Sequence, residues 1–232
     1  MSKTTRTAGP ILIVVAALIA VVGAVAALGA SKSPAAHNHR GHGHHHAPRA
    51  LTQRQVALRE DMRRLWEDHI TWTRLAIISL TTNSPDTQAT VGRLLKNQTD
   101  IGNAVKPFYG RKAGNELTNL LRQHILIAAD VVAAAKAGDS AKLAEAQARW
   151  AKNGDDIATF LASANPRYWK LAAMKAELQR HLKLTTDEAV ARLQGNWGAD
   201  VAAYEKIHTH ALHLSDVLSD GLMKQFPRRF AR

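Results

Sequence analysis

The chain contains no cysteine. Disulfide bonds, thiolate metal sites, cysteine nucleophiles and covalent attachment of a c-type haem are therefore excluded. Aromatic residues make up only 5% of the sequence, and no segment shows the alternation of apolar and polar residues that is typical of a half-buried strand. Alanine-rich and leucine-rich segments dominate instead, and they favour long amphipathic helices. We therefore expect an all-α protein.

Motifs of known reactions are also missing. The sequence has no glycine-rich phosphate loop, no GxSxG nucleophile motif, no HExxH zinc motif and no pair of Glu-x-x-His motifs of the di-iron kind. Serine, histidine and aspartate occur, but no arrangement of them points to an activated nucleophile. A non-enzymatic role is therefore the expectation, and an enzyme is kept as the third interpretation.

The formal net charge of +12 is unevenly distributed. Residues 1–59 contain no acidic residue and seven basic ones, which are Lys3, Arg6, Lys32, Arg40, Arg49, Arg54 and Arg59. The rest of the chain has 24 basic and 19 acidic residues, a net charge of +5. These charges are mixed along each predicted helix, whereas a nucleic-acid-binding protein is expected to show a concentrated basic face. We therefore expect no nucleic-acid partner.

The N-terminus carries an apolar segment that is long enough to cross a membrane. Residues 11–30 contain no charge, and about 20 apolar residues span the hydrocarbon layer as a helix. Lys3 and Arg6 in residues 1–10 predict a cytoplasmic N-terminus, so the rest of the chain lies on the extracytoplasmic side of the cell membrane. The alternative is a signal peptide cleaved near residues 24–26, which would give a secreted protein. We favour an uncleaved single-pass anchor.

The segment that follows, residues 31–50, is rich in proline, glycine and polar residues, which predicts a disordered tether. It holds six of the twelve histidines, namely His37, His39, His42, His44, His45 and His46. Neutral imidazole is a good ligand for Ni, Zn and Cu(II), so this segment is predicted to bind divalent transition metal ions. The alternatives are a low-complexity linker and a remnant of an affinity tag.

Residues 51–232 are predicted to form a helical bundle of five to six helices. Helical periodicity places these at about 51–82, 85–106, 112–137, 140–164, 166–182 and 186–225. The second is expected to end at Pro107, before a turn at Gly110. Thr185 is expected to cap the last helix, with Glu188 completing a capping box. Gly195 and Gly198 are expected either to bend this helix or to let another helix approach it closely.

Several predicted helices carry a polar residue where the period predicts burial. His69 lies in an apolar stripe made by Leu58, Met62, Leu65, Trp72, Ala76 and Leu80. His124 and Asp200 hold similar positions on other helices. Because bundles build metal sites from inward residues on facing helices, His69, His124 and Asp200 form a candidate divalent-metal site, and two histidines could instead bind a haem. The alternatives are a structural polar network and a pocket for an organic ligand.

Residues 66–79 and 93–110 carry a distinctive pattern, and the second reads RLLxNQxDIGNAxxPxYG. With this pattern the chain resembles an uncharacterised family of exported or membrane-anchored bacterial helical proteins, over about residues 58–226. The resemblance implies an all-helical exported domain and no particular function. The histidine-rich segment lies outside it.

The leading hypothesis is a membrane-tethered extracytoplasmic helical bundle that binds or buffers transition metal ions through His37–His46. The second is a non-enzymatic interaction or small-ligand-sensing module, in which the bundle is the working part. In either case residues 11–30 would contact the membrane, and the bundle would have a second copy of itself or another membrane protein as partner.

Overall fold

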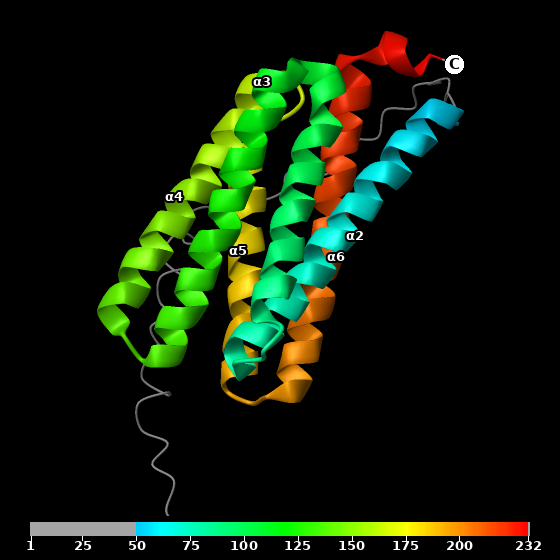
Figure 1. The fold of residues 1–232 in the computed structure, drawn as a ribbon. Coiled ribbons are helices and arrows are strands. Elements are labelled where there is room, and N and C mark those ends of the chain that lie inside the picture. Colours follow the sequence, from blue (N-terminus) through cyan, green and yellow to red (C-terminus); the bar gives the residue numbers. More distant parts are fainter. Residues whose placement is uncertain (1–49, 232) are drawn as a thin grey trace, which may run out of the picture.

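The computed structural model describes residues 50–231, which form a bundle of long helices and contain no strand (Figure 1). Its elements are α2 (Gln53–Thr82), α3 (Thr87–Ala137), α4 (Ser140–Ala164), α5 (Leu171–Leu193), α6 (Trp197–Gln225) and the 3-10 helix η1 (Pro227–Phe230). The predicted all-α bundle is thereby confirmed for this part of the chain. The predicted N-terminal anchor and tether lie outside the described residues. Within residues 50–231, no helix combines the length and the apolar character needed to span a membrane.

The ends of the helices follow local capping chemistry. Thr52 caps α2 through a capping box with Gln55, in which each side chain bonds the backbone of the other residue. Asn83 ends α2 in the left-handed conformation with φ of 54°. The Asp139 carboxylate accepts the backbone N–H of Lys142 at 3.0 Å and so caps α4. These caps satisfy backbone groups that a helix leaves unpaired at its ends.

Helix α3 is a tight hairpin rather than one rod (Figure 1). Gly110 has φ of 84° and ψ of 170°, and at this residue the chain reverses between an arm of residues 87–109 and an arm of residues 111–137. The first arm continues through Pro107, so the prediction that it ends there is wrong, whereas the turn at Gly110 is confirmed. A Cβ on Gly102 would lie 2.6 Å from the carbonyl oxygen of Gly114, which shows how closely the two arms approach.

The break between the last two helices differs from the one predicted. Thr185 does not cap a helix, because α5 continues through it to Leu193. The buried hydroxyl of Thr185 instead donates to the carbonyl oxygen of His181 at 2.9 Å, one turn earlier in the same helix. The chain turns at Gly195, which has φ of 68°, and α6 begins at Trp197. A bend was expected at this glycine, and the structure makes it a complete turn between two helices.

The helices are arranged so that each packs against its neighbours in a closed ring. α2 packs against α3 and α6, α4 packs against α3 and α5, and α5 packs against α6. The main core contains buried side chains from all five helices, among them Ile70, Leu117, Ile157, Met174 and Leu214. This closed arrangement brings polar residues on different helices to the centre of the bundle.

Candidate functional site

Four histidines from four helices meet in the core of the bundle. We call them the histidine cluster: His69 of α2, His124 of α3, His181 of α5 and His210 of α6. Each side chain is at most 5% exposed. His181 is the centre, because its ring centroid lies 5.8 Å from that of His69, 6.0 Å from that of His124 and 5.9 Å from that of His210.

Neighbouring amide side chains fix two of the four rings. Gln98 Nε2 donates to Nδ1 of His69 at 3.2 Å, so the proton of this neutral ring is assigned to Nε2. His124 Nδ1 donates to Oδ1 of Asn153 at 2.8 Å, and Asn153 Nδ2 donates to the carbonyl oxygen of Leu120 at 3.1 Å. The lone pair of His124 is therefore assigned to Nε2. The amides thus set the tautomers of the two rings in opposite ways.

The other two rings have fewer partners. Among residues 50–231, Nδ1 of His181 has no hydrogen-bond partner, and neither ring nitrogen of His210 has one. Glu177 is a charged group near His210, and its Oε2 lies 3.6 Å from Nδ1. Unpaired buried polar atoms are costly, so these two rings are held less favourably than those of His69 and His124.

Burial keeps the histidine cluster neutral at pH 7. Burial, together with the nearby His124, lowers the pKa of His69 to about 4, against the opposing effect of hydrogen bonds from Asn97 and Gln98. Burial also lowers the pKa of His124 to about 4. Burial and the three neighbouring rings hold the pKa of His181 well below its ordinary value, and burial lowers the pKa of His210. The cluster therefore offers lone pairs rather than positive charge.

A small cavity of about 40 Å³ lies beside three of the four rings. Its lining includes His69, His124, His181 and Gln98, and the remainder is apolar. Three buried polar atoms of the lining residues, Trp66 Nε1, Gln98 Oε1 and His181 Nδ1, lack a hydrogen-bond partner among the described residues. A buried water needs two or more polar partners, and the described residues expose only apolar atoms on the cavity wall, so we expect the cavity to be dry. At about 40 Å³ it is also too small for an organic ligand.

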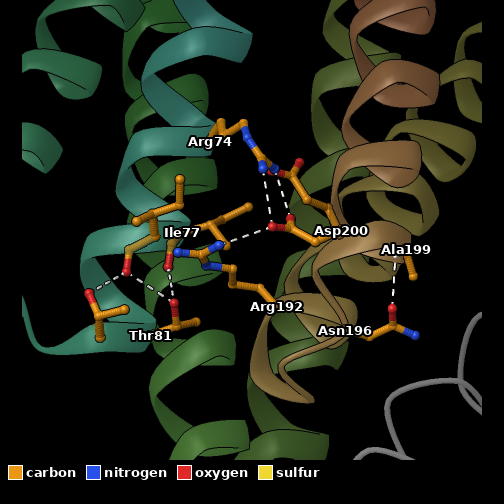
Figure 2. Close-up of polar contacts among 10 residues, drawn as sticks. Arg74, Ile77, Thr81, Arg192, Asn196, Ala199 and Asp200 are labelled. Carbon is orange, nitrogen blue, oxygen red and sulfur yellow. Dashed lines mark hydrogen bonds and ion pairs between the residues drawn. The ribbon is translucent and has the colours of Figure 1, made fainter.

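Asp200, the third residue of the predicted metal site, lies in a separate ion-pair cluster (Figure 2). Its two carboxylate oxygens accept from Arg74 at 2.8 and 3.1 Å, and Oδ2 also accepts from Arg192 at 3.1 Å. Arg74 in addition bonds Oε1 of Glu188 at 2.8 Å. Burial tends to raise the pKa of Asp200, but the hydrogen bonds and charges of the two arginines outweigh it and lower the pKa.

Glu188 has a different environment from Asp200 although both bond Arg74. Its side chain is fully buried, and Oε2 has no hydrogen-bond partner in the part of the chain that the structure describes. Burial raises the pKa of Glu188 to about 7, and Arg74 only partly opposes that effect. The ion-pair cluster thus contains one carboxylate that stays charged and one that titrates near neutral pH.

The structure therefore brings two of the three predicted bundle ligands together and adds two others. His69 and His124 both contact His181, whereas Asp200 is bonded to arginines. His181 was not predicted as a site residue; it lies next to the end of the helix predicted at residues 166–182. Within residues 50–231, no group of three or more His, Asp or Glu side chains is arranged to hold a metal ion. The tether histidines, His37 to His46, lie outside the described residues.

Comparison with protein families, curated proteins and solved structures gave no match to this chain. The resemblance to a family of exported helical proteins accordingly stays a prediction.

Proposed function

We propose that the protein is a membrane-tethered, extracytoplasmic helical bundle that binds or buffers transition metal ions through its histidine-rich segment. The observation that carries the proposal is the concentration of six histidines within residues 37–46, next to an apolar segment at residues 11–30. Imidazole nitrogen is a ligand for Zn²⁺, Ni²⁺ and Cu²⁺, and closely spaced histidines can supply two to four ligands to one ion.

The bundle supports this role as a carrier rather than as the metal site. In the histidine cluster, His69 and His124 are already bonded to amides, and in the ion-pair cluster Asp200 is bonded to two arginines. A metal at Asp200 or at Nδ1 of His69 would break these hydrogen bonds, and within residues 50–231 no three His, Asp or Glu side chains converge to hold an ion. The proposal therefore assigns the metal to the segment alone, with moderate affinity and the metal order Cu²⁺ above Ni²⁺ and Zn²⁺.

Calorimetric titration of Ni²⁺, Zn²⁺ and Cu²⁺ into the full-length protein tests the proposal. The variant replaces all six segment histidines with asparagine, and the matched control replaces two exposed or half-buried bundle histidines, His208 and His213, in the same way. We expect the six-site variant to lose binding and the control to retain it. Equal binding by the two proteins would contradict the assignment. Metal analysis of protein purified without a metal-affinity column would show whether any ion is carried from the cell.

The location is tested separately. A reporter fused after Arg232 should lie outside the cytoplasm, because residues 11–30 are proposed to cross the membrane once with the N-terminus inside. A reporter found inside the cell would contradict both the topology and the proposed access to extracytoplasmic metal.

A second candidate function is a small-ligand-sensing or interaction module formed by the bundle. The observation in its favour is an open groove of about 520 Å³ along the second arm of α3 and α4, a size that suits a small molecule. Tyr109 and Phe160 supply aromatic surface to it, and Glu116 and Asp156 supply carboxylates. A cationic or amphipathic ligand would fit this lining. A thermal-shift screen of such compounds with wild type and Phe160→Ala would test it, and a screen without any shift, together with strong metal binding, would count against it.

A further inference from the structure

One end of the bundle differs in charge from the rest of the molecule. It contains the start of α2, the turn of the α3 hairpin, the connection from α4 to α5, and the C-terminal segment (Figure 1). We call this surface the basic end, and its residues are 50–57, 105–115, 163–172 and 223–231.

Contacts between these segments show that they form one surface. The Thr52 hydroxyl donates to the carbonyl oxygen of Phe230 at 2.8 Å, which joins α2 to the C-terminus. Arg229 donates to the carbonyl oxygen of Pro107 at 2.7 Å, which joins the C-terminus to the hairpin turn. Gln225 Nε2 donates to the carbonyl oxygen of the last residue of α4 at 3.0 Å. The four segments are therefore fixed relative to one another.

The basic end contains nine cationic residues and no Asp or Glu. They are Arg54, Lys106, Arg111, Lys112, Arg167, Lys170, Lys224, Arg228 and Arg229, and all except Lys106 are exposed. The opposite end is balanced: residues 82–87, 136–142 and 192–200 together contain three basic and three acidic residues. The net charge of the bundle is thus concentrated at one end, although the charges along each helix are mixed.

Apolar side chains are exposed among these cations. Leu51 is 42% exposed, Tyr168 37% and Leu171 45%, and all three belong to the basic end. Leucine and tyrosine next to lysine and arginine are the side chains that favour the boundary between headgroups and acyl chains. Charge and apolar contact are therefore offered by the same surface.

The place where the chain enters the bundle also favours a membrane as the partner of the basic end. Residue 50 lies at the basic end, immediately before α2. Only residues 31–49 separate it from the apolar segment 11–30. Even fully extended, this connection spans at most about 70 Å at 3.3–3.6 Å per residue. If residues 11–30 cross a bilayer, the basic end is the part of the bundle that the chain holds nearest to it.

We propose that the basic end docks on the surface of a bilayer that contains anionic lipid. Its exposed arginines and lysines bind the phosphate groups of the lipids, and Leu51, Tyr168 and Leu171 enter the interface. The orientation follows from the membrane anchor in the proposed function, but docking itself depends only on the charge and apolar surface of residues 50–231. The bundle would then stand on the membrane with its α5–α6 turn pointing away.

The absence of cysteine in the chain allows a direct test with single fluorescent labels. Ala172→Cys places a label at the basic end, and Gly198→Cys places one at the opposite end, where an added Cβ meets no atom within 4 Å. The full-length protein is reconstituted in vesicles of phosphatidylcholine alone or with 30 mol% phosphatidylglycerol, each with a quencher attached to the acyl chains. We expect quenching of the label at residue 172 in the anionic vesicles only, and little quenching at residue 198 in either.

Charge variants make the test specific. The first replaces Arg111, Lys112, Lys224 and Arg228 with glutamine, four exposed cations without hydrogen bonds to described residues. Because a basic residue near an anionic surface contributes about fivefold, the ratio of docked to undocked protein should fall by a factor on the order of 10² to 10³. The control removes the same charge elsewhere, by glutamine at Arg64, Lys142, Lys152 and Lys183. It should dock like wild type.

Equal quenching at residue 172 in the two kinds of vesicle, or equal loss in the two charge variants, would overturn the proposal. Competition with duplex DNA is a further test. If DNA at a phosphate concentration equal to that of the lipid abolished the quenching at residue 172, the basic end would bind polyanions in general and the proposal would be overturned. A protein that bound only the anionic vesicles would support docking and at the same time contradict the membrane anchor, so the two proposals fail separately.

Discussion

Acidification from pH 7 to pH 5 is expected to destabilise the bundle through its histidine cluster. The pKa of His69 and that of His124 are about 4 in the folded protein, against an ordinary value of 6.5. Between these values the unfolded chain binds more protons than the native protein does. The free energy of unfolding therefore rises with pH through this window. The contribution of the neutral histidines is fully present above pH 6.5 and is lost as the pH falls towards 4.

The magnitude follows from the two pKa values. At pH 5, each of His69 and His124 lowers the free energy of unfolding by about 2 kcal/mol relative to pH 7. His181 and His210 act in the same direction, since the pKa of each is lowered by burial. Two histidines alone thus remove about 4 kcal/mol, a large part of the 5–15 kcal/mol that stabilises a typical domain.

Glu188 opposes this effect. Its pKa of about 7 lies above the ordinary 4.5, so between these values the native protein binds the extra proton and stability falls as the pH rises. Protonation of Glu188 between pH 7 and pH 5 therefore raises the free energy of unfolding by about 2 kcal/mol. The histidines outnumber this single carboxyl, so we expect net destabilisation.

Urea denaturation followed by circular dichroism at pH 7, 6 and 5 measures the effect. In His124→Gln, the difference in unfolding free energy between pH 7 and pH 5 should shrink by about 2 kcal/mol, whatever the packing cost at pH 7. Leu121→Ala on the same helix is the control, because it should lose about 2–5 kcal/mol equally at both pH values. If His124→Gln kept the full pH difference of wild type, the reasoning from buried neutral histidines would be refuted.

Three further predictions concern single residues. Gly102→Ala should lower the free energy of unfolding by at least about 1–3 kcal/mol in urea denaturation, because the new Cβ would lie 2.6 Å from a backbone oxygen. Gly92→Ala is the control in the same arm, and it should raise the free energy of unfolding by about 0.5–1 kcal/mol because its Cβ meets no atom within 4 Å. Asp200→Asn should cost about 3–5 kcal/mol by leaving two largely buried arginines short of charge, and a loss below about 1 kcal/mol would argue against the ion-pair cluster. Glu188→Gln should abolish the fall of about 1 kcal/mol that Glu188 causes between pH 6 and pH 8, measured by denaturation at both values.

Local signals in the sequence predicted much of the fold correctly. The stripe of residues 58–80 predicted the buried face of α2, and Gly138 with Asp139 predicted the boundary between α3 and α4. Such signals depend on residues within one or two helical turns of each other, so they can be recognised without knowing which other helices pack nearby. Thr185 shows the limit. Its sequence context suits a helix cap, but burial between helices makes an intrahelical bond to His181 the better partner for its hydroxyl.

Helical periodicity determined from sequence alone that His69, His124 and Asp200 face the interior, and all three are buried. Periodicity gives the face of a helix but no position along the bundle axis. Asp200 lies ten residues before His210 on α6, about 15 Å along the helix, so it pairs with Arg74 while His210 meets His181. The concentration of cations at one end has the same origin. Four segments far apart in the sequence meet there because the lengths of the helices and the register of their packing bring them to one level, and only the tertiary structure decides that register.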